Sequence, residues 1–145
     1  MIPRERFDHE LRRLQDAVLA LGSQVENALV DSVKSLKDRD LETARDIITQ
    51  DRLINEKRFE LEAEALAVIA TQQPMARDLR TIAAVLDITS ELERIGDYAK
   101  GIARINLMIG GQPLMGPVLH LPAMGARQAI CCTSRWRPSL EATRS

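Results

Sequence analysis

The strongest constraint in this sequence is a set of three long segments in which apolar residues recur every three or four positions. That spacing places the apolar side chains on one side of an α-helix. The segments cover about residues 5–37, 41–70 and 75–109. The first stripe consists of Phe7, Leu11, Leu14, Val18, Leu21, Val25, Leu29, Val33 and Leu36. The pattern predicts three helices, each about 45 Å long at a rise of 1.5 Å per residue.

Short breaks separate the three segments. Asp40 precedes the second segment, where its side chain suits the N-cap of a helix. Pro74 suits the first turn of the third helix, which we therefore expect over about residues 75–109. Gly110 then provides a stop signal. Because the connections are short, we expect an all-α fold, an antiparallel three-helix bundle that forms one domain over residues 1–110.

Residues 111–145 differ from the rest of the chain in composition. They hold four of the six prolines, both cysteines and the only tryptophan, and their apolar residues keep no sustained period. We expect a linker and an irregular tail here, with a helical turn near residues 121–130. The composition changes abruptly near Ala126, which suggests the hypothesis of a shifted reading frame. Sequencing of the gene would test that hypothesis.

Composition argues against several classes of function. The chain carries 20 basic and 21 acidic residues, whereas a nucleic-acid-binding domain usually has a basic face. Its first residues are charged where a signal peptide would be apolar. No stretch approaches the ~18 apolar residues that a membrane span requires. We therefore expect a cytoplasmic protein that neither binds nucleic acid nor inserts into a membrane.

Motifs for catalysis are scarce. The sequence has no Glu-x-x-His pair of the kind found in di-iron bundles. It also has no glycine-rich phosphate loop and no nucleophile elbow. His9 and His120 are isolated, and we interpret both as surface or capping residues. The expected protein is not an enzyme.

The segment TSELERIGDYAKGIA, residues 89–103, raises the main functional question, because acidic residues lie beside its apolar stripe. Glu93 and Asp97 lie one helical turn apart, separated by about 40° around the axis. Their like charges repel each other, and a shared cation would remove that repulsion. Carboxylate oxygens are ligands that Mg²⁺, Mn²⁺, Ca²⁺ and iron prefer.

The same segment has a second interpretation. Arg80, Arg94 and Lys100 could neutralise the acids in surface ion pairs, and the spacing alone favours this interpretation because such acidic pairs are common in helices. Gly96 indicates that something packs closely here, since glycine in a helix costs about 1 kcal/mol relative to alanine. A ligand or a neighbouring helix would each explain that glycine.

Three stretches together resemble a known family. They are QDRLINE at residues 50–56, QQPMARDLR at residues 72–80 and ELERIGDYAKGIA at residues 91–103. With the opening segment FDHELRRLQDAVLALGSQVENAL at residues 7–29, they resemble the PhoU family, the accessory and regulatory proteins of the phosphate-specific transport system. The resemblance covers residues 1 to about 115.

The resemblance implies a fold and a site. Members of the family have two three-helix repeats, each with an E/D-x-x-x-D motif that can hold metal ions such as Mg, Mn or Fe. In this sequence the motif corresponds to Glu93 and Asp97, with Asp51 and Asn55 of the second helix as neighbours. The sequence departs from the family pattern because residues 111–145 do not resemble the start of a second repeat.

The resemblance also implies a function. Family members are non-enzymatic regulators that limit phosphate uptake and repress the phosphate-starvation response. They act as adaptors between the ATPase of the phosphate ABC transporter and a sensor histidine kinase, and they form homodimers. The alternative for this chain is a truncated helical fragment or structural interaction bundle without regulatory activity.

Overall fold

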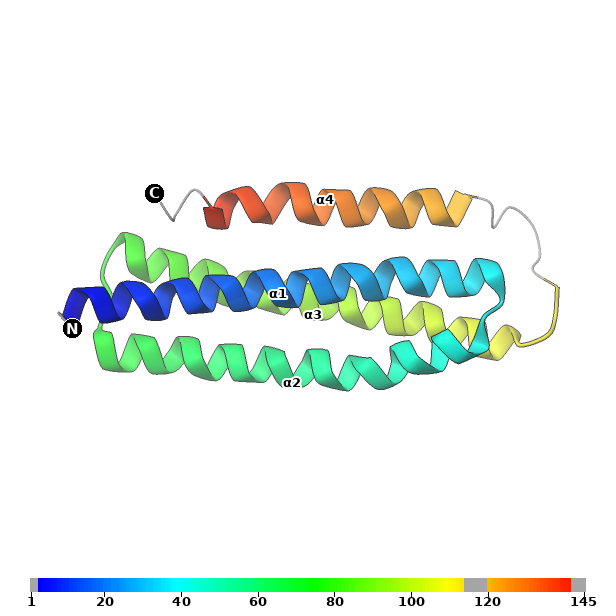
Figure 1. Ribbon diagram of the computed structural model, residues 1–145, viewed down its shortest axis with the longest axis horizontal. Helices are drawn as coiled ribbons and strands as arrows, with labels where there is room; N and C mark the ends of the chain where they lie inside the picture. Colours follow the sequence, from blue (N-terminus) through cyan, green and yellow to red (C-terminus); the bar gives the residue numbers. More distant parts are fainter. Residues whose placement is uncertain (1–2, 114–119, 142–145) are drawn as a thin grey trace.

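The computed structural model describes residues 3–113 and 120–141, which form four α-helices and no strand (Figure 1). The helices are α1 (Pro3–Asp38), α2 (Leu41–Gln72), α3 (Arg77–Ile109) and α4 (Leu121–Glu141). Helices α1, α2 and α3 pack against one another in pairs, and α4 lies along α1 on the outside of this bundle. The predicted all-α fold with a three-helix bundle is confirmed.

The apolar stripes of the three long helices meet in one core. Ile54 and Leu61 of α2 face the stripe of α1, and Ile82 and Leu92 of α3 complete the cluster. The α1 side chains at the centre of the core are Leu14, Val18, Leu21 and Val25, each at most 1% exposed. Since removal of this apolar surface from water is the main driving force for folding, the core fixes how the polar sides of α2 and α3 face each other.

The ends of the long helices agree with the predictions in two places and differ in a third. Asp40 is the N-cap of α2, where its Oδ1 accepts hydrogen bonds from the backbone N–H groups of Glu42 and Thr43. Gly110, at φ 54°, ends α3 and donates its N–H to the carbonyl oxygen of Asn106. Both predictions are confirmed.

Helix α3 begins at Arg77, two residues after the expected start at about 75, and the prediction that Pro74 lies in its first turn is wrong because Pro74 precedes the helix. The chain reverses direction between α2 and α3 through residues 73–76. Gln73 and Ala76 have φ values of 45° and 51°, which do not fit a right-handed helix. The proline therefore belongs to the turn and not to the first turn of the helix.

The expected helical turn near residues 121–130 is part of a longer helix, α4, and the prediction of an irregular tail after it is wrong for the residues up to 141. Pro122 does not interrupt this helix because it lies in the first turn, where a missing N–H leaves no hydrogen bond unmade. A sustained apolar period is not required, since α4 packs along a single helix, α1. Residues 114–119 of the predicted linker lie outside the described residues. The domain boundary at residue 110 and the reading-frame hypothesis stay predictions.

In residues 3–113 and 120–141, no helix combines the length and the apolar character that crossing a bilayer requires.

Candidate functional site

The antiparallel packing of α2 against α3 brings all four predicted site residues to one side of this helix pair. Asp51 and Asn55 lie on α2, and Glu93 and Asp97 lie on α3. Asp51 is buried, Asn55 and Glu93 are partly buried, and Asp97 is exposed. We call these four residues and Lys100 the acidic row. It extends from the core boundary at Asp51 to the solvent at Asp97.

Asp51 already has a cationic partner. The Nζ atom of Lys100 lies 2.5 Å from Asp51 Oδ2, and Asn55 Nδ2 donates to the same oxygen at 3.2 Å. Asn55 Nδ2 also donates to the backbone carbonyl oxygen of Asp51. Because a buried carboxylate without a partner is strongly unfavourable, Lys100 and Asn55 explain how Asp51 can lie beside the core.

The negative charge of Glu93 is less well compensated by neighbouring cations than that of Asp51. Its partial burial raises its pKa, and the nearby charge of Asp97 raises the pKa further. Arg58 of α2 acts in the opposite direction, but its guanidinium group also pairs with Glu62 at 2.6 Å. Glu93 and Asp97 therefore form a pair of neighbouring carboxylates whose negative charge is only partly neutralised, at the solvent-facing end of the acidic row.

This arrangement separates the four predicted metal ligands into two groups. Glu93 and Asp97 stay the predicted ligands of a divalent cation, since the charge of Asp97 disfavours the charged form of Glu93 and Asp97 is exposed. Asp51 and Asn55 belong instead to the hydrogen-bonded group around Lys100. Throughout the described parts of the chain, no three His, Cys, Asp or Glu side chains lie together in a way that could hold a metal ion. The metal site itself stays a prediction.

Two of the basic residues that were expected to neutralise the acidic residues do form ion pairs. Arg94 pairs with Glu91 at 3.5 Å, and Lys100 pairs with Asp51 of the neighbouring helix. The sequence identified Lys100 as a possible counter-ion but not its partner, which is 49 positions away. At Gly96, an added methyl group would lie 3.6 Å from Ile54 Cγ2, an ordinary van der Waals contact, so the packing of α2 does not by itself require glycine here.

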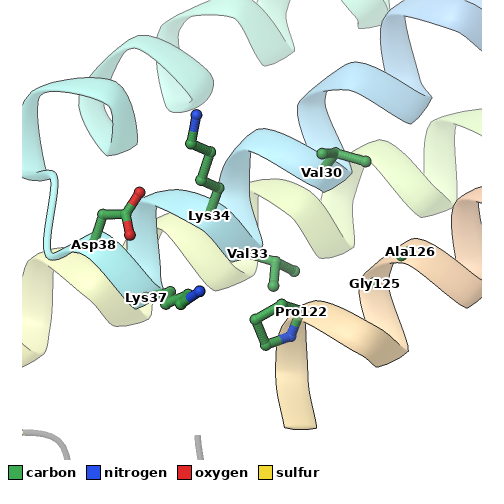
Figure 2. A pocket seen from close by; sticks show the side chains of 8 residues that line it. All are labelled: Val30, Val33, Lys34, Lys37, Asp38, Pro122, Gly125 and Ala126. Carbon is green, nitrogen blue, oxygen red and sulfur yellow. The ribbon is translucent and has the colours of Figure 1, made fainter. Parts of the chain in front are cut away.

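Two of the surface pockets formed by the described residues lie away from the acidic row. One, of about 300 Å³, lies between the C-terminal end of α1 and the start of α4 (Figure 2). Its walls include Val33 and Pro122, with Lys34 and Lys37 at its edge. The other pocket lies beside the α2–α3 turn. No residue of the acidic row lines either pocket, so neither adds a group to the candidate site.

The chain was compared with known proteins. Residues 18–105 match the family model described as "PhoU domain". The chain is 34% identical over 105 residues to the phosphate-specific transport system accessory protein PhoU homolog of Rhizobium meliloti, covering 72% of this chain and 44% of that protein. It is 36% identical over 102 residues to the corresponding accessory protein PhoU of Serratia marcescens, covering 70% of this chain and 42% of that protein.

The fold is also similar to a solved structure. The crystal structure of the phosphate transport system regulatory protein PhoU from Streptococcus pneumoniae superposes with a TM-score of 0.79 at 31% sequence identity. The match covers 88% of this chain and 59% of that chain. This chain spans about half the length of the curated relatives that it matches.

Proposed function

This chain belongs to the PhoU family, and we propose that it takes part in the regulation of phosphate transport. The observation that carries this proposal is the family match over residues 18–105, which spans most of the three-helix bundle and includes the acidic row. Relatives named as accessory proteins of the phosphate-specific transport system support the same role. The chain matches about half of their length, so the regulatory activity of this chain is proposed and not taken over from those relatives.

The proposed mode of action is that of a non-enzymatic adaptor in the cytoplasm. The protein would contact the ATPase of a phosphate ABC transporter and a sensor histidine kinase, and thereby limit phosphate uptake and repress the starvation response. A homodimer is part of this proposal.

Metal binding is a separate part of the proposal. Glu93 and Asp97 would supply two carboxylate ligands to Mg²⁺, Mn²⁺ or iron, which the raised pKa of Glu93 and its proximity to Asp97 support. Asp51 and Asn55 would lie behind this pair as neighbours. Such a cation would neutralise the outer acidic row, and it would give the α2–α3 surface a different charge for partner recognition.

Complementation tests the regulatory role. A bacterial strain that lacks its PhoU protein would receive this chain, a full-length relative, or a chain with the core substitution Leu92→Asp. We expect this chain to restore phosphate-dependent repression of a starvation reporter, as the full-length relative does, and Leu92→Asp to fail because Leu92 is buried in the core. Circular dichroism would verify that this chain is folded.

The opposite outcome would favour the alternative function. If the chain is helical and abundant but leaves the reporter at the level of the empty vector, it is a structural fragment without regulatory activity. This alternative is tested because the chain covers only about half the length of its relatives.

A further inference from the structure

We propose that two copies of this chain associate through the outward face of the C-terminal part of α3, with the two α3 helices antiparallel. The face consists of Tyr98, Gly101, Ile105 and Met108, which we call the α3 stripe. This inference rests on the homodimer that is part of the proposed function. It adds the surface that forms the dimer and the way in which the two copies meet.

The α3 stripe lies on the side of α3 that faces away from the core. Its residues follow one another at spacings of three, four and three positions, which places them within about 80° of one another around the helix axis. The buried residues Leu92 and Ala99 lie on the opposite side of the helix. Tyr98, Ile105 and Met108 are 64%, 51% and 84% exposed, so a continuous row of apolar side chains is open to a partner.

The α3 stripe is also free of charge. Within residues 98–109 the charged residues are Lys100 and Arg104. Lys100 pairs with Asp51 of α2, and Arg104 follows Lys100 by one turn on the same side of α3. Both charges therefore lie toward α2 and away from the stripe. The centres of protein interfaces are depleted in charged residues in the same way.

Packing within the chain does not explain Gly101. A β-carbon added at this position would have no atom within 4 Å. Glycine in the interior of a helix is less favourable than alanine, because it has more conformational freedom to lose on folding. A second helix that approaches closely on this face would gain from a position without a side chain. The glycine therefore indicates close packing against another molecule.

The order of large and small residues in the stripe fits a second copy of the chain. A two-fold axis beside position 103 places Gly101 opposite Ile105 of the second copy, and Tyr98 opposite its Met108. Ile105 then fills the space above Gly101, and the thioether of Met108 meets the aromatic ring, which is a favourable contact. Each contact occurs twice because the two copies are equivalent.

The charge at the N-terminal end of the stripe fits the same arrangement. Arg94 precedes Tyr98 by one turn on the same side of α3. In the antiparallel dimer it would lie beside Gly110 of the second copy, at the C-terminal end of α3. The carbonyl groups at a helix C-terminus carry partial negative charge and attract a cation. The pair of Arg94 with Glu91 is exposed and 3.5 Å long, so it competes only weakly with this contact.

The size of the stripe predicts the strength of the dimer. A standard stable interface involves roughly 20–30 residues of each partner and buries about 800 Å² of each. The α3 stripe has four residues, so the dimer is expected to be weak. We expect a dissociation constant in the micromolar range, on the order of 10–100 μM.

The test is sedimentation velocity of the purified chain at concentrations from about 1 to about 500 μM, a range that brackets the expected dissociation constant. Gly101→Ile is expected to weaken the dimer at least about ten-fold, because the new side chain meets Ile105 of the second copy. Ile105→Gly is expected to weaken it similarly, because the space above Gly101 is then unfilled. Gly101→Ile/Ile105→Gly opposes large and small residues again, and should return the dissociation constant to within about three-fold of the natural value.

The matched control is Leu66→Ser, which removes an equally exposed leucine from α2, where Glu62 lies one turn away. Its dissociation constant should stay within about two-fold of the natural value. Circular dichroism checks that each variant is folded. If Ile105→Gly loses helix, Met108→Ser takes its place, because Met108 is 84% exposed and its loss leaves the core unchanged. It is also expected to weaken the dimer.

Three outcomes would overturn the inference. The natural chain could stay monomeric throughout the concentration range. The dimer could form with the same dissociation constant in Gly101→Ile and Ile105→Gly, in which case the homodimer stands and its surface lies elsewhere. The double variant could associate no better than the single variants, and the antiparallel pairing of Gly101 with Ile105 would then be wrong.

Complementation separates this inference from the regulatory role. If the natural chain restores repression but is monomeric, the regulatory role stands and the dimer is wrong. If complementation fails while the α3 variants change the dissociation constant as expected, the regulatory role is wrong and the α3 dimer stands.

Discussion

Asn106 of α3 donates a hydrogen bond of 3.2 Å from its side-chain Nδ2 to the backbone carbonyl oxygen of Asp40, the residue that caps α2. The same amide group donates to the carbonyl oxygen of Ser35 at 3.0 Å, near the end of α1. One fully buried side chain therefore connects all three helices of the bundle at this end. It stabilises the α1–α2 turn because its buried amide group donates to carbonyl oxygens on both sides of the turn.

Asn106→Ala is accordingly expected to destabilise the fold by about 2 kcal/mol, through the loss of these hydrogen bonds and the cavity that remains. Urea unfolding followed by circular dichroism measures the change. Asn27→Ala is the matched control, because Asn27 is exposed on α1, and it is expected to change the stability by less than about 0.5 kcal/mol. Equal effects of the two substitutions would contradict the proposed role of Asn106.

A double-mutant cycle on Asp51 and Lys100 tests the ion pair at the acidic row. Lys100→Met is expected to destabilise the fold by about 3 kcal/mol in the absence of metal, because it leaves a buried carboxylate without its cation. Asp51→Asn is expected to have a smaller effect, since the freed lysine can reach solvent. The double variant should be more stable than Lys100→Met alone. Additive effects of the two single substitutions would mean that the pair makes no coupled contribution.

The residues that the sequence predicted correctly are those governed by local rules. The helical stripe of Val18, Leu21 and Val25 follows from a period of 3.6 residues, and the cap at Asp40 follows from its position before an apolar run. Neither prediction requires knowledge of a distant partner. The start of α3 was predicted less well, because the path of the turn depends on the positive φ values of Gln73 and Ala76.

The residues that the sequence could not place are those that depend on packing between elements. The pairing of Asp51 with Lys100 requires the register of α2 against α3, which periodicity within one helix does not determine. Similarly, the position of α4 depends on its close packing against α1 at Gly125. The candidate site was therefore predicted as a set of residues, but not as two groups with different partners.

Glu93 gives the protein a pH dependence of defined sign. Its pKa in the folded state is raised above the ordinary value of 4.5, chiefly by burial and then by Asp97. The folded state therefore binds more protons than the unfolded state just above that pH, and stability falls as the pH rises through the folded-state pKa. Glu93→Gln is expected to stabilise the fold at pH 7 by roughly 0.2–0.5 kcal/mol, the size of a like-charge pair one helical turn apart, and to have little effect near pH 3.

Urea unfolding at pH 3 and pH 7, without metal, measures this effect. The comparison chain is Asp97→Asn, in which one cause of the raised pKa has been removed. Glu93→Gln should stabilise this background less than it stabilises the natural chain. A loss of stability on Glu93→Gln at pH 7 would show that Glu93 makes a favourable interaction, against the direction of its pKa shift.

Asp40 gives a pH dependence of the opposite sign. The side-chain hydroxyl of Thr43, and then the backbone N–H of the same residue, lower the pKa of Asp40 by donating hydrogen bonds to its carboxylate. Its contribution to stability is therefore present above the unfolded-state pKa and is lost as the pH falls through the folded-state pKa. Asp40→Ala should lower the urea midpoint at pH 7 more than at pH 2. Asp46→Ala, at an exposed position inside α2, is the control and should lower the midpoint at pH 7 less.

The close approach of α4 to α1 depends on Gly125. A β-carbon added at this position would lie 3.0 Å from Val33 Cγ2, which is closer than side chains normally pack. Gly125→Val is therefore expected to push α4 away from α1. Backbone amides of residues 121–130 should exchange hydrogen for deuterium several-fold faster, while the α1–α3 core keeps its protection.

A compensating substitution distinguishes this clash from a change in helix propensity. Val33→Ala should return the exchange of Gly125→Val toward the natural rate, because it removes the two methyl groups that the new side chain would meet. Gly101→Ala is the control for propensity: no atom lies within 4 Å of the added methyl group, so the substitution should stabilise α3 by about 1 kcal/mol. Unchanged exchange in Gly125→Val would mean that α4 does not depend on this contact for its position on the bundle.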